Sequence, residues 1–115
     1  MWKIIYYETE TGECPVYEFI NSLSIKMSAK AAKEIELLEE FGNALKMPYS
    51  RSLQDGINEL RIQAEGNICR ILYFFYVEKQ IILTHGFIKK TGRTPPNEID
   101  LALSYRTDYI RRFKK

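Results

Sequence analysis

One segment of the chain carries the side chains best suited to chemistry. Residues 81–96 read IILTHGFIKKTGRTPP, and their apolar start is typical of a β-strand. The strand leads directly into His85, Phe87, Lys89 and Lys90. An imidazole can move a proton near neutral pH, a cation can bind a phosphate, and a ring can stack on an unpaired base. The segment therefore predicts a strand whose end is suited to an anionic substrate such as RNA.

Two arginines on neighbouring strands extend this pattern. If Glu65 and Gly66 form a two-residue hairpin loop, Arg61 lies directly opposite Arg70. Like charges in this arrangement destabilise a sheet, so the pair makes most sense where an anion lies over it.

The same rule at a second turn, Glu78-Lys79, places Arg70 beside Phe87 and Leu72 beside His85. Strand alternation then adds one lysine to the same face. The predicted constellation is Arg61, Arg70, His85, Phe87 and Lys89. A three-residue loop at either turn would shift the outer strand by one residue and turn its side chains to the other face.

Each of these residues also has a purely structural interpretation. Arg61 could pair with Glu59 or with a glutamate of a helix, His85 could be a hydrogen-bonded sheet residue, and Phe87 could belong to the core. The sequence leaves these alternatives open.

The remaining strands follow from composition and alternation. We expect strands at residues 2–7, 59–64 and 67–77, the last being the most apolar and the centre of the sheet. In the second of these, apolar and polar residues alternate, which predicts one solvent-exposed face. Residues 42–56 have the composition of a loop.

Helical spacing predicts three helices. The first begins at Pro15, the second runs from residue 24 or 25 to Phe41 with Gly42 as its stop, and the last runs from an Asn97 N-cap to about Phe113. The expected inner face of the second helix is Met27, Ala31, Ile35 and Leu38.

These elements predict an α+β fold. Its antiparallel-rich sheet carries two N-terminal helices and a C-terminal helix, and residues 1–115 form a single domain. Arg106 falls where the apolar stripe of the last helix expects a hydrophobe, so it could reach the face of the constellation.

Charge and composition narrow the class of protein. A net charge of +2 is too small to indicate a nucleic-acid partner, but cations concentrate in residues 89–93 and 106–115. Glutamates gather at Glu34, Glu36, Glu39 and Glu40, as a solvated helix face or as a surface for a partner. No signal peptide is apparent and no apolar run approaches the roughly 18 residues of a membrane span, so we expect a cytoplasmic protein.

The two cysteines, Cys14 and Cys69, are expected to be reduced. No Cys/His cluster has metal-ligand spacing, and we expect neither a metal nor a cofactor.

Three segments carry a resemblance to a known family. They are residues 53–61 (LQDGINELR), 70–74 (RILYF) and 85–95 (HGFIKKTGRTP), followed at a matching spacing by Glu98, Ile99 and Ala102. Together they resemble the phage-derived HigB-like toxins of the RelE/ParE superfamily, over nearly the whole chain. The match is specific in the last two segments and loose elsewhere.

The resemblance implies a small RelE-like fold and the toxin of a type II toxin-antitoxin system. Such a toxin is a ribosome-dependent mRNA endonuclease, in which the RNA 2′-hydroxyl attacks the neighbouring phosphate without a metal. Its partners would be the ribosome, mRNA and a helix-turn-helix, HigA-like antitoxin that forms a hetero-oligomer with it.

Carried onto this sequence, the resemblance matches Arg61 and Arg70 to the strand arginines and residues 86–91 to a Gly-Phe-x-Lys-Lys-Thr motif. With the residue chemistry, it predicts a catalytic set of Arg61, Arg70 and His85 and an RNA-binding set of Phe87, Lys89, Lys90, Arg93 and Arg106. Two alternatives stay open: a non-enzymatic ParE-like toxin acting on DNA gyrase, and an RNA-binding regulator without activity.

Overall fold

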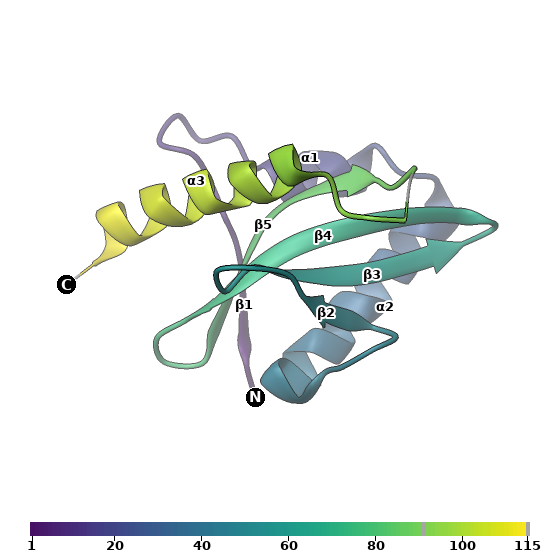
Figure 1. Cartoon of the computed structure of the whole chain (residues 1–115), viewed down its shortest axis with the longest axis horizontal. Helices are drawn as coiled ribbons and strands as arrows, with labels where there is room; N and C mark the ends of the chain where they lie inside the picture. The colour runs from purple at the N-terminus through teal and green to yellow at the C-terminus, as the bar shows by residue number, and fades with distance from the viewer. Residues whose placement is uncertain (91, 115) are drawn as a thin grey trace.

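The computed structural model describes residues 1–90 and 92–114, and the bounds below refer to these residues (Figure 1). In chain order the elements are β1 (Lys3–Tyr6), α1 (Pro15–Asn21), α2 (Ile25–Phe41), the 3-10 turn η1 (Gly42–Ala44), β2 (Ser50–Ser52), β3 (Asn58–Ala64), β4 (Asn67–Tyr76), β5 (Gln80–Ile88) and α3 (Pro96–Phe113).

The strands form one mixed sheet in the order β1-β5-β4-β3-β2. β1 pairs with β5 in parallel, and the other neighbours are antiparallel. Helices α1 and α2 pack on one face of the sheet and α3 crosses the other (Figure 1). The predicted α+β fold is confirmed.

The local sequence of helix α2 determines where the helix begins, which face it buries and where it ends. The Ser24 side chain accepts a hydrogen bond from the Met27 N–H at 3.2 Å and caps the first turn. The predicted inner face is buried against the sheet, where each large side chain contributes about 1.5–3 kcal/mol. Gly42 ends the helix at φ 52°, and a side chain there would collide with the Trp2 indole.

The hairpin between β3 and β4 has the predicted two-residue loop. Glu65 and Gly66 have φ values of 53° and 78°, as a type I′ turn requires at both central positions. Ala64 therefore pairs with Asn67, and Arg61 lies opposite Arg70.

The next hairpin reaches its predicted register by a different route. Tyr76 pairs with Gln80, so the turn has three residues and the two-residue prediction is wrong. The extra turn residue alone would point the side chains of β5 to the opposite face of the sheet. A β-bulge at Thr84 inserts a second extra residue, and from His85 onward the pairing is again the predicted one. Arg70 consequently lies beside Phe87 and Leu72 beside His85, as predicted.

Residues 42–56 are not all loop, which corrects the sequence prediction. They contain η1 and the edge strand β2, in which Arg51 pairs with Glu59 of β3. Three residues are too few for alternation to reveal a strand.

Two glutamates that were predicted to be exposed to solvent are instead buried by neighbouring side chains. Glu59 of β3 is buried rather than solvent-exposed, since Arg70 and Thr94 lie against it. Glu34 of α2 is also buried, with its Oε1 atom 3.4 Å from the Lys30 ammonium.

Helix α3 starts with Pro96 after a Pro95 cap, not with an Asn97 cap. A proline suits the first helical position because its fixed φ matches the helix and its missing N–H would be unpaired there. Both cysteines are free, as expected. No helix within residues 1–90 and 92–114 combines the length and apolar character needed to cross a bilayer.

Candidate functional site

Cations gather on the face of the sheet that α3 only partly covers. Register places Arg61, Arg70 and Arg51 on this face, one on each of three neighbouring strands. Lys89 follows β5 and stays beside β4, because its N–H donates to the Ile68 carbonyl at 2.9 Å. We call Arg51, Arg61, Arg70 and Lys89 the cationic cluster.

The pKa of Lys89 reflects the charges that surround it. Burial is the largest cause that lowers the pKa of its ammonium group. The charges of Arg70, Arg61 and Arg51 lower this pKa further, and Glu59 alone among the neighbours raises it. The cluster therefore concentrates positive charge that an anion would relieve.

Arg70 is the most enclosed member of the cluster. Its residue is 3% exposed, Nη1 donates to the Cys69 carbonyl at 2.9 Å, and Nε lies 3.7 Å from Oε1 of Glu59. The same carboxylate oxygen accepts a hydrogen bond from the Thr94 hydroxyl at 2.5 Å. Burial lowers the pKa of Arg70, whereas Glu59 raises it.

This buried pair is incompletely satisfied. Among the described residues, neither the Nε of Arg70 nor the Oε2 of Glu59 has a hydrogen-bond partner. Thr94, which lies between β5 and α3, therefore holds the carboxylate that faces the guanidinium. Arg70 is enclosed in this conformation.

Arg61 is half-buried and lies toward the edge of the sheet. Its Nη1 donates to the Met47 sulfur at 3.3 Å, in the segment before β2. The alternative pairing of Arg61 with Glu59 is not formed, because Glu59 holds Arg70 instead.

His85 connects the sheet to α3. It is 5% exposed, its Nε2 lies 3.0 Å from Oε1 of Glu98, and its Nδ1 lies 3.1 Å from the Thr84 hydroxyl. The Tyr105 ring packs edge-on against it at 5.8 Å. Burial lowers the pKa of His85 and Glu98 partly opposes this. Both ring nitrogens are thus occupied in this conformation.

The predicted RNA-binding residues divide into two groups. Phe87 is 9% exposed and packs in the core beneath α3, and Arg106 donates to the Asp55 carbonyl in the turn between β2 and β3. Lys90 and Arg93 are exposed near the cationic cluster. Thr91, the last residue of the Gly-Phe-x-Lys-Lys-Thr motif, lies outside the described residues.

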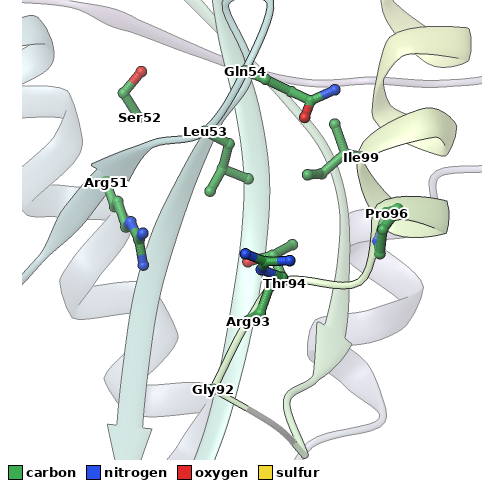
Figure 2. A pocket seen from close by; sticks show the side chains of 9 residues that line it. All are labelled: Arg51, Ser52, Leu53, Gln54, Gly92, Arg93, Thr94, Pro96 and Ile99. Carbon is green, nitrogen blue, oxygen red and sulfur yellow. The ribbon is translucent and has the colours of Figure 1, made fainter.

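A pocket of about 480 Å³ adjoins the cluster, between β2 and the start of α3. Arg51 reaches it from β2 and Arg93 from the segment before α3, and the Gln54 amide extends toward Ile99 (Figure 2). Its lining is Arg51, Ser52, Leu53, Gln54, Gly92, Arg93, Thr94, Pro96 and Ile99.

The sequence alone did not indicate Arg51, Glu59, Thr94 and Glu98 as site residues. Glu98 had a signal, since a carboxylate in a first helical turn faces the preceding segment, which here holds the only histidine of the chain. Arg51 had none, because its strand was not recognised.

These features define the class of protein as a small α+β protein with a mixed sheet, helices on both faces and a cationic face bordered by a pocket. The family model described as phage-derived protein Gp49-like (DUF891) matches residues 18–107, and the chain belongs to this family. It is a toxin-like family related to the RelE/HigB-type toxins, which confirms this coarser part of the sequence resemblance. The comparison with curated proteins gave no significant match.

Proposed function

We propose that this chain is the toxin of a type II toxin-antitoxin pair and that it cleaves mRNA on the ribosome. The cationic cluster is the observation that carries the proposal. Its four positive side chains share one face with a pocket beside them, and this arrangement suits a phosphate chain better than a neutral ligand.

The proposed reaction is an internal phosphoryl transfer. The 2′-oxygen attacks the adjacent phosphorus as its proton leaves, the bond from phosphorus to the 5′-oxygen breaks, and that oxygen takes up a proton. The products are a 2′,3′-cyclic phosphate and a 5′-hydroxyl end. Negative charge grows on the phosphate oxygens, so positioned cations lower the barrier.

Arg51, Arg61 and Lys89 are the cluster members best placed to meet the scissile phosphate first. Arg51 is exposed and the other two are half-buried, whereas Arg70 is buried. Arg70 would join them when the segment between β5 and α3 moves. Lys90, Arg93 and the partner ribosome would hold the flanking backbone.

Proton transfer has two candidates. His85 has the appropriate chemistry, but it must first be released from Glu98. Lys89 has a pKa lowered by burial and by neighbouring cations, which favours a lysine that exchanges protons.

The enclosure of His85 also favours a second candidate function, an RNA-binding regulator without catalytic activity. It would use the same cationic cluster and would need no acid or base. Cleavage therefore has to be measured directly.

The test is induced expression of the chain in a bacterial host. We expect growth and translation to stop, primer extension on cellular mRNA to show new breaks within coding regions, and plasmid supercoiling to stay normal. Arrest without breaks would favour the inactive regulator, and altered supercoiling with intact mRNA would favour a gyrase inhibitor.

A further inference from the structure

We infer that the pocket beside the cationic cluster binds one nucleobase of the RNA and that Gln54 selects adenine there. The inference rests on the proposed function for its substrate class, since it concerns an RNA strand held by the cluster. It adds base selectivity, which a cluster of cations alone does not provide.

The pocket has the size and walls that a base requires. Its volume of about 480 Å³ falls within the range of small-molecule sites, roughly 300–1,000 Å³. Leu53 and Ile99 supply apolar surface from opposite sides, one from the end of β2 and one from α3 (Figure 2). A planar ring between them would be removed from water on both faces.

Gln54 provides the only side-chain amide among the residues that line this pocket. An amide presents one donor and one acceptor side by side, which matches the adjacent N7 and N6 groups of adenine. In single-stranded RNA this edge of the base is free to be read.

The backbone around Gln54 is held in place, so its side chain starts from a fixed point at the rim of the pocket. The Leu53 N–H donates to the Ile57 carbonyl at 2.9 Å, and the Ile57 N–H donates to the Gln54 carbonyl at 2.9 Å. Arg106 of α3 donates to the carbonyl of Asp55, the next residue, and so ties the turn to the helix. In this conformation Arg106 therefore has a positioning role.

The charges of the pocket fix how the nucleotide would enter. Arg51 belongs both to the pocket lining and to the cationic cluster, and Arg93 extends into the same space (Figure 2). A phosphate between these guanidinium groups would place its base against Leu53 and Ile99. The bound base is therefore a near neighbour of the phosphate at the cluster.

The experiment measures binding of four 2′-O-methylated heptamers, which cannot undergo attack by the 2′-oxygen. Each consists of uridines with A, C, G or U at the central position. We expect the full chain to prefer the adenine heptamer by roughly fivefold to 150-fold, the range of a bidentate contact. Gln54→Ala should reduce this preference to about twofold, chiefly by weakening the adenine heptamer, because the phosphate contacts that all four heptamers share remain.

Gln63→Ala is the matched control. Gln63 is an exposed glutamine on the same face of β3 as Arg61, and it does not line the pocket. It should keep the wild-type preference. Breaks mapped by primer extension should likewise be enriched for adenine at one fixed position in the wild type and lose that enrichment in Gln54→Ala.

The results separate this inference from the proposed function. Equal binding of all four heptamers, or a preference that survives Gln54→Ala, overturns the base pocket while leaving mRNA cleavage in place. A preference for another base overturns the assignment to adenine. If no heptamer binds and the mapped breaks show no base preference, the pocket is overturned, and the presence of the breaks still decides the proposed function.

Discussion

Arg70 and Glu59 form the most consequential pair at the scale of single residues. The carboxylate of Glu59 occupies the position beside the guanidinium that a phosphate oxygen would take during binding. The pair keeps Arg70 charged and oriented within the sheet at the cost of two buried charges. Its role in folding and its role in the proposed catalysis must therefore be separated by experiment.

Arg70→Met should lose both stability and cleavage. Removing one partner of a buried ion pair leaves the other charge uncompensated, which typically costs about 3–5 kcal/mol. The double variant Glu59→Gln/Arg70→Met removes both charges and should recover most of that stability without recovering activity. Urea unfolding and primer extension on both variants make the comparison, and a double variant that cleaves normally would exclude Arg70 from the site.

Arg61→Ala offers a cleaner test of the cluster, because Arg61 has no buried ion-pair partner among the described residues. Losing one positioned donor to a developing oxyanion costs about 3–4 kcal/mol, or roughly a thousandfold in rate. Growth arrest should disappear while the fold is retained. Arg111→Ala removes the same charge near the C-terminal end of α3 and should stay toxic; equal toxicity of the two variants would place the site elsewhere.

His85 makes a prediction about pH because it is the only histidine of the chain. Its folded-state pKa is lowered from the ordinary 6.5, so below that pH the unfolded chain binds the proton more readily than the folded one. The free energy of unfolding should then fall as pH drops from 7.5 to 5.5. Urea titrations at both values should show a smaller fall for His85→Gln, and a wild type that gains stability in acid would mean that the ion pair with Glu98 dominates.

At the scale of elements, the segment between β5 and α3 is the cover of the site. Its Thr94 hydroxyl holds Glu59 directly, and Glu59 in turn lies against Arg70. Helix α3 is fastened at further points, among them His85 to Glu98, Asp55 to Arg106 and Tyr7 to Asp108. The position of the cover thus depends on polar contacts as well as on the packing of Ala102 and Tyr109 against the sheet.

Thr94→Val keeps the shape of the side chain and removes its hydroxyl. Glu59 then loses its one short hydrogen bond, and an unsatisfied buried acceptor costs about 1–3 kcal/mol. Unfolding in urea measures the loss. Thr107→Val, at an exposed threonine of α3, should change stability by less than about 0.5 kcal/mol, and similar losses in both variants would show that the Thr94 contact is not specific.

The elements also show what the sequence could predict. Alternation located β3, apolar runs bounded by turn residues located β4 and β5, and helical spacing located α2 with its inner face, because these segments are long enough for their patterns to appear. The pairing of β4 with β5 was predicted correctly from His85 onward although the turn was not, since the bulge at Thr84 offsets the longer loop; between the turn and the bulge the pairs differ from the prediction by one residue.

The parts that could not be predicted depend on contacts between distant segments. The burial of Glu59 comes from Thr94, which is 35 residues further along the chain. The enclosure of His85 comes from the docking of α3 over β5. Neither contact leaves a periodic signal in the local sequence, so solvent exposure was the default expectation for Glu59.

At the scale of the whole molecule, the two faces of the sheet differ in charge. The cationic cluster lies on the face that carries α3, whereas the glutamates Glu36, Glu39 and Glu40 lie on α2, which packs on the other face. The small net charge of +2 conceals this separation. The cationic cluster attracts a polyanion, whereas the acidic C-terminal half of α2 repels one, so RNA is expected to approach at the cluster.

The same separation leads to a prediction about the antitoxin, the partner that a toxin family implies. A surface that attracts RNA is costly to leave open in a cell, so we expect the antitoxin to cover the cationic cluster with acidic side chains. Charge reversal at two cluster positions, Arg51→Glu and Lys89→Glu, should weaken the complex, while Arg111→Glu, outside the cluster, should not.

The measurement uses the toxin co-purified with the product of the adjacent gene, for which we expect a helix-turn-helix, HigA-like protein. Affinity is measured at low and high salt, because contacts between exposed charges weaken as ionic strength rises. RNA heptamers should not bind the intact complex. If cluster reversals leave the affinity unchanged, or if RNA still binds to the complex, the antitoxin must neutralise the toxin from another surface, and the acidic end of α2 becomes the next place to mutate.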